Sequence, residues 1–178
     1  MKKSGISFII LLIIVLSAIG ISLPEKQVNT EYLRIHIRAD SNSQEAQAVK
    51  YLVKDAVVQY LTPIISELDT KKKAQERLSQ ELVNIEKTAN VVLKEQGFDY
   101  VCKANLKREE FPTRAYGEFT LEQGVYDALI LELGSGAGDN WWCVVYPPLC
   151  FTGEGTSYVY KSKIYEIIKN FQEKREEK

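Results

Sequence analysis

The alternation of apolar and polar positions predicts a strand at the start of the chain's body. Between residues 32 and 39 the two kinds of side chain alternate strictly. The apolar set is Leu33, Ile35, Ile37 and Ala39, and the polar set is Arg34, His36 and Arg38. A period of two is typical of a strand with one face buried and the other toward solvent. We therefore expect a half-buried strand here.

Two stretches with helical spacing follow this strand. The first covers residues 44–61, begins near Asn42, which has Glu45 three positions later, and is expected to stop before Pro63. The second begins at about residue 64 or 70 and runs to residue 96. Gly97 supplies the stop at its C-terminal end. Both helices carry an apolar stripe and are therefore expected to pack on a core.

After residue 99 the period returns to two, which predicts further strands. Apolar alternation falls within residues 100–106, 115–121 and 129–133, and the turn at 122–124 predicts a hairpin between the last two. Residues 158–174 return to helical spacing. This order predicts an α+β fold. We expect a mainly antiparallel sheet with two long consecutive helices and a C-terminal helix packed on it.

The N-terminus reads as a targeting segment rather than as part of the fold. Lys2 and Lys3 precede an uninterrupted apolar run at residues 8–16, and small residues follow. Residues 1–20 are thus predicted to be a signal peptide, with a retained membrane anchor as the alternative. Residues 21–31 read as a linker, 32–174 as one globular domain and 175–178 as a frayed tail. The membrane would be contacted only through the N-terminal segment.

Composition excludes several classes of function. The chain holds 23 Lys and Arg against 24 Asp and Glu, for a net charge of -1, so it lacks the basic surplus of a nucleic-acid binder. It has a single histidine and three cysteines, too few for a His-rich metal centre or a disulfide scaffold. We predict no cofactor and no metal.

The cysteines have different predicted states. Cys143 and Cys150 bracket a segment with two prolines, and export would place them in an oxidising compartment. We expect these two to form a disulfide. Cys102 lies on the apolar face of its predicted strand and is expected to be a buried free thiol.

No set of residues predicts catalysis. The glycine-rich segment 134–138 lacks the spacing of a phosphate-binding loop and reads as a turning connector. His36, the sole histidine, lies between two arginines that would lower its pKa and make it a poor base. Trp141 and Trp142 should point to opposite faces of a strand, so that one fills the core while the other is free to anchor a partner.

Three segments together resemble the stage II sporulation protein R family. They are LRIHIRADSNS at residues 33–43, FPTRAYG at 111–117 and GSGAGDNWWCVVYPPLC at 134–150. The resemblance implies a signalling protein that is not an enzyme. Such a protein is exported across the forespore membrane and activates a membrane-embedded aspartic protease of the mother cell, which then processes a sigma-factor precursor.

The predicted partner-binding surface contains both tryptophans, because tryptophan is favoured at protein interfaces. We expect the extracytoplasmic part of the protease to contact Asp139, Asn140, Trp141 and Trp142. The polar face of the first strand is the second candidate surface, formed by Arg34, His36 and Arg38. The alternative function is that of a cell-wall-associated binding protein or hydrolase.

Overall fold

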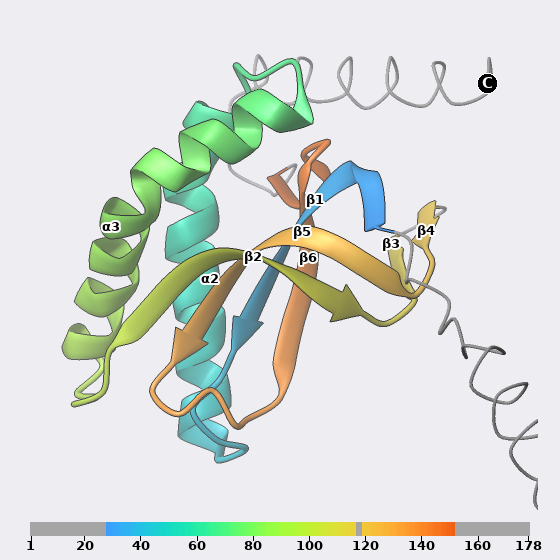
Figure 1. Ribbon diagram of the computed structural model, residues 1–178. Coiled ribbons are helices and arrows are strands. Elements are labelled where there is room, and N and C mark those ends of the chain that lie inside the picture. Colours follow the sequence, from blue (N-terminus) through green and yellow to red (C-terminus); the bar gives the residue numbers. More distant parts are fainter. Residues whose placement is uncertain (1–27, 117–118, 152–178) are drawn as a thin grey trace, which may run out of the picture.

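The computed structural model describes residues 28–116 and 119–151, and a four-stranded mixed sheet lies at its centre (Figure 1). The strand order is β2-β5-β1-β6, where the bounds are β1 Val28–Arg38, β2 Cys102–Phe111, β5 Gly124–Leu133 and β6 Asn140–Tyr146. β1 runs parallel to β5, whereas β1–β6 and β2–β5 are antiparallel. The fold is therefore α+β, as predicted, with a sheet that is mostly but not wholly antiparallel.

Two long helices cover one face of the sheet. α2 spans Gln44–Ile65 and α3 spans Lys71–Glu95. Their apolar stripes pack on the alternate residues of β1 and β5 that point the same way, with Ile35, Ile37, Leu129 and Leu131 completely buried. Burying each such side chain stabilises the fold by about 1.5–3 kcal/mol. This interface is the main hydrophobic core.

A second, smaller core lies on the opposite face of the sheet. It combines Tyr32, Phe111, Tyr126 and Ile130 with Leu121 of a separate two-stranded hairpin. That hairpin consists of β3 (Arg114–Tyr116) and β4 (Phe119–Leu121). A short 3₁₀ turn, η1 (Leu149–Phe151), follows β6. β1 is consequently an interior strand buried on both faces, which corrects the expectation of a half-buried strand.

The helix ends differ in part from the sequence expectation. Ser43 rather than Asn42 caps α2, because its side chain accepts a hydrogen bond from Ala46 N at 3.1 Å. α2 continues through Pro63 to Ile65, so the predicted stop before the proline is wrong. A proline in the last turn removes one intrahelical bond, and the burial of Ile65 favours continuing the helix.

α3 begins at the later of its two expected starts, and its C-terminal end is confirmed. Thr70 is its N-cap, with the side chain accepting from Lys73 N at 3.3 Å. Gly97 has a positive φ of 79°, and the N–H of Phe98 returns to the carbonyl of Leu93 at 3.0 Å. This is the glycine-dependent helix stop that the sequence indicated.

The predicted hairpin between residues 115–121 and 129–133 is wrong. β3 and β4 pair with each other, and β5 pairs instead with β2 along ten residues of each strand. The long β2–β5 ladder satisfies far more backbone groups than a pairing of β5 with three-residue β4 would. The predicted C-terminal helix at 158–174 and the predicted signal peptide at 1–20 lie outside the described residues.

Candidate partner-binding site

Two loops at one end of the sheet interlock and present the start of β6. Ser135 N donates to Asp40 Oδ1 at 2.7 Å, and Ser135 Oγ donates to Asp40 O at 2.6 Å. Asp139 N donates to Asn42 Oδ1 at 2.6 Å. Gly138 N donates to Ala39 O at 2.9 Å. The segments 39–42 and 134–139 therefore hold one another in a single arrangement.

Glycine is required at two points of this interlock. A Cβ at Gly138 would lie 2.3 Å from the backbone oxygen of Ser41. A Cβ at Gly134 would lie 2.3 Å from Asp40 Oδ1, and the backbone there has a φ of +57°. Steric exclusion thus explains these glycines. The segment is a closely packed connector, in agreement with the sequence interpretation.

A buried lysine holds the end of the connector. Lys50 of α2 is 1% exposed, and its Nζ donates to Asp139 O at 3.1 Å and to Gln47 Oε1 at 2.7 Å. Burial lowers the pKa of Lys50, and the charge of Asp139 acts in the opposite direction. Sequence reasoning did not find this residue, because lysine at a helical position is usually solvated.

The two tryptophans at the start of β6 point to opposite faces of the sheet, as predicted. Trp141 packs at the margin of the main core, with Lys54 Nζ 5.9 Å from its ring centre. Trp142 belongs to the second face, where its ring stacks on His36 at 3.6 Å between centres. Both rings are partly exposed, whereas Asp139 and Asn140 are exposed. These four consecutive residues are thus the accessible beginning of β6 and the residue before it, with one tryptophan ring on each face of the sheet.

Arg34 lies at the centre of an aromatic cluster. It is fully buried, and its Nη2 donates to Tyr116 Oη at 2.7 Å. Its guanidinium carbon lies 4.3 Å from the Phe111 ring centre and 4.9 Å from that of Tyr126. Burial lowers the pKa of Arg34, and contact with Tyr116 and Tyr126 raises it. These contacts fasten the β3–β4 hairpin to the sheet.

His36 is also buried, at 1% exposure, beside a cluster of charges. Glu109 Oε1 lies 3.2 Å from His36 Nδ1 and also pairs with Arg38, which reaches Glu132 at 2.6 Å. Burial lowers the pKa of His36, Arg38 lowers it further, and contacts with Asn140 and Glu109 oppose both. Arg34 and His36 are therefore interior groups, and Arg38 is the one member of the predicted polar face that is partly exposed.

The cysteines have the states expected from the sequence. Cys143 and Cys150 form a disulfide with their Cα atoms 6.2 Å apart, which joins β6 to η1. Cys102 is a buried free thiol, and burial raises its pKa to about 12. The disulfide begins one residue after Trp142 and thus fixes the strand that carries the surface.

The described residues contain neither a metal-binding cluster nor a membrane-spanning helix. In residues 28–116 and 119–151 no cluster of three His, Cys, Asp or Glu side chains has an arrangement that could hold a metal ion. Within those same ranges no helix combines the length and apolar character needed to cross a membrane.

Comparison with known proteins shows the family of this chain. A family model described as stage II sporulation protein R matches residues 29–156, which is most of the chain and includes all three motifs. The chain belongs to the stage II sporulation protein R family. The protein of that name from Bacillus subtilis (strain 168) is 32% identical to it over 119 residues, covering 67% of this chain and 53% of the relative. The chain thus spans about half the length of that relative. No solved structure matches it.

The three family-like segments contact one another in the structure. The family-like segments at 33–43 and 134–150 contain the two loops that bond to each other, and the segment at 111–117 supplies Phe111 and Tyr116 around Arg34. Sequence reasoning missed the acceptor roles of Glu109 and Glu132, because strand pairing decides which carboxylates face Arg38. The family supports a role in sporulation.

Proposed function

We propose that this protein is an exported signal that activates a membrane-embedded aspartic protease of the mother cell. Activation leads to processing of a sigma-factor precursor during sporulation. The protein acts in the space between the forespore and mother-cell membranes, and it contacts the extracytoplasmic part of the protease. The observation that carries this proposal is the family match across residues 29–156.

The geometry supports activation by binding. The candidate contact is the accessible beginning of β6, residues 139–142, which two interlocked loops, Lys50 and a disulfide hold in place. A preordered surface loses little conformational entropy on binding. An activator needs only to bind the active state of its receptor more tightly than the inactive state, and a 100-fold preference corresponds to about 2.7 kcal/mol. Two partly buried aromatic anchors are sufficient for that difference.

Of the two candidate surfaces, the one at residues 139–142 is the more accessible to a partner, because Arg34 and His36 are buried. A contact at either of these side chains requires the β3–β4 hairpin or Trp142 to move, whereas Asp139 and Asn140 are already exposed. We therefore propose residues 139–142 as the primary contact. Arg38 lies at its border, and Arg34 and His36 act by supporting the face from within.

The test is co-expression of the full chain with the candidate protease and its precursor substrate in a non-sporulating host. Precursor cleavage is expected only when the exported chain is present. Cleavage that is equal with and without the chain would contradict the proposal. A protease variant lacking its catalytic aspartate is the control for cleavage by host enzymes.

Surface variants locate the contact. The paired substitution Asp139→Ala with Trp141→Ala is expected to reduce precursor cleavage at least about tenfold, with the exported chain still accumulating. Lys72→Ala, on the far end of α3 with its side chain 86% exposed, is the matched control and should leave cleavage unchanged. Full cleavage by the paired variant would show that this surface is not the contact.

A further inference from the structure

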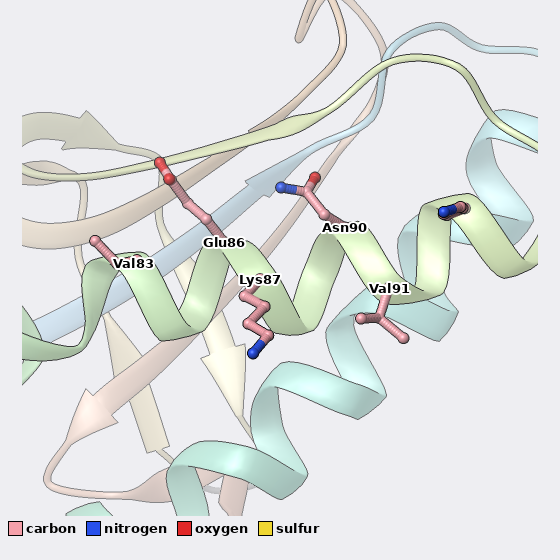
Figure 2. Close-up of a pocket in the computed structure, with 6 residues that line it drawn as sticks. Val83, Glu86, Lys87, Asn90 and Val91 are labelled. Atoms are coloured by element: carbon pink, nitrogen blue, oxygen red, sulfur yellow. The ribbon is translucent and has the colours of Figure 1, made fainter.

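The two edge strands of the sheet, β2 and β6, differ in how their outward backbone groups are covered. At β2, the N–H of Cys102 donates to Asn90 Oδ1 at 2.7 Å and the N–H of Ala104 donates to Glu86 Oε1 at 2.8 Å. Figure 2 shows both side chains pointing from α3 toward the neighbouring strand. Both line a pocket whose other labelled residues, Val83, Lys87 and Val91, also belong to α3. β2 also carries five charged residues. Covered amides and charges are the usual protection of an edge strand.

The opposite edge, β6, lacks this protection at its beginning. The strand contains no charged residue, and in the described part of the chain no strand pairs with its outer side. Ala39 N donates to Asp139 O at 3.4 Å, so the backbone groups of Asp139 point toward β1. In an antiparallel pair the backbone N–H and C=O groups of successive residues point alternately toward the partner strand and away from it, so those of Trp141 also point toward β1. The backbone groups of Asn140 and Trp142 then face outward. From Cys143 onward the strand is buried, so the accessible edge is Asn140–Trp142.

Different side chains border this accessible edge on the two faces. On the helix face, Trp141 lies beside Lys54, which also approaches the ring of Tyr51, itself 50% exposed. On the other face, the guanidinium of Arg114 lies 6.0 Å from the ring centre of Trp142. Arg114 is exposed and forms no ion pair with any described residue, whereas Lys54 pairs with Asp55 at 2.5 Å. One face therefore offers an apolar aromatic contact, and the other offers an aromatic ring beside an exposed cation.

We propose that Asn140–Trp142 is a strand-addition site for an extended segment of the partner in which an acidic residue neighbours an apolar one. The inference rests on the proposed function, since it specifies how the protease would bind. The segment forms backbone hydrogen bonds with Asn140 and Trp142. Neighbouring side chains of an added strand point to opposite faces, so its carboxylate meets Arg114 while its apolar neighbour meets Trp141 and Tyr51.

A second copy of this chain fits the site less well. Two β6 edges paired about a two-fold axis present the same residues to each other. The two Arg114 side chains would then approach on one face without a carboxylate between them, and like charges in that position oppose pairing. An acidic segment of a different protein supplies the carboxylate that can pair with Arg114.

Asn140→Pro tests the backbone bond directly. Proline is compatible with the first residue of an edge strand, and here it removes the outward N–H. The reference is Asn140→Ala, which loses the same side chain but keeps that N–H. Binding of the full chain to the full-length protease, both in detergent micelles, should be about tenfold weaker for the proline variant than for the alanine variant. Near-ultraviolet circular dichroism checks that both variants retain the folded tryptophan environment.

Amide hydrogen exchange of the wild-type complex gives a second readout that needs no variant. The amides of Asn140 and Trp142 should become protected when the protease is added. If the complex forms with equal affinity for Asn140→Pro and Asn140→Ala, and these amides exchange as in the free chain, strand addition is overturned and the proposed function stands. If wild-type chain and protease form no complex, the proposed function fails, and the docking mode fails with it.

Charge reversal tests the chemistry of the segment. Arg114→Glu should weaken binding to the protease about tenfold or more, because the partner's carboxylate would face a like charge. Lys72→Glu, an equal change of charge at an exposed position of α3, is the control and should alter the affinity less than twofold. Equal effects of the two variants would overturn the assignment of an acidic segment to the Arg114 face.

Discussion

Gly138→Ala should destabilise the protein by separating the two interlocked loops. The new Cβ would lie 2.3 Å from Ser41 O and 2.5 Å from Ser41 C, whereas ordinary contacts begin at 3.4 Å. Because the obstructing atoms are backbone, a rotamer change cannot relieve the overlap. The loops must move apart by about 1 Å.

The magnitude follows from the bonds that this movement breaks. Three hydrogen bonds cross the junction at this point: Gly138 N to Ala39 O at 2.9 Å, Ala137 N to Asp40 O at 3.3 Å, and Asp139 N to Asn42 Oδ1 at 2.6 Å. Each contributes about 0.5–1.5 kcal/mol net. We expect Gly138→Ala to lower the free energy of unfolding by about 2–4 kcal/mol.

Urea unfolding followed by tryptophan fluorescence measures this change. Gly124→Ala is the matched control, since its Cβ would make an ordinary contact of 3.5 Å with the ring of Tyr126, and the free energy of unfolding should change by less than about 0.5 kcal/mol. If Gly138→Ala proves as stable as Gly124→Ala, the loops are not held together in the way described. Residues 139–142 would then not be held in one arrangement before the partner binds.

Three further predictions concern the groups around the site. Lys50→Met keeps the buried stem but loses the bonds to the loop, and urea unfolding should show a loss of about 1–3 kcal/mol. Burial lowers the pKa of His36, so the unfolded chain binds a proton that the folded chain excludes. The contribution of His36 to the free energy of unfolding is therefore fully present above about pH 7 and is lost as the pH falls below that range. His36→Gln should flatten that pH profile, and an unchanged profile would contradict the assignment. Reducing the Cys143–Cys150 disulfide should cost about 2.5 kcal/mol in urea unfolding with and without dithiothreitol; denatured, unreduced protein should show one alkylatable thiol, at Cys102.

Local patterns predicted the parts of the fold that local physics decides. The alternation at residues 32–39 identified β1, and the opposite orientation of Trp141 and Trp142 followed from strand geometry alone. Gly97 terminates α3 because a left-handed residue closes the last turn, a requirement that can be read from sequence. Each of these inferences depends on contacts within one element.

Non-local pairing decided the features that sequence reasoning missed. The alternation in β1 could not reveal that the face of Arg34 and His36 is covered, since Phe111, Tyr116 and Trp142 arrive there from three other elements. The turn at 122–124 suggested a hairpin, but β5 instead forms its ladder with the distant β2. The candidate surface at residues 139–142 was predicted from its two tryptophans, and the resemblance added the identity of the partner. Lys50 and Arg114 became visible only through tertiary contacts.

The most direct test of the proposed signalling role is the rate of precursor cleavage by the protease in proteoliposomes as purified chain is added to the extracytoplasmic side. The proposed function predicts a rate that rises with chain concentration and reaches a plateau, because binding saturates the receptor. The rise should be absent with protease lacking its catalytic aspartate. A cleavage rate that stays at its basal value at every chain concentration would contradict activation by this protein.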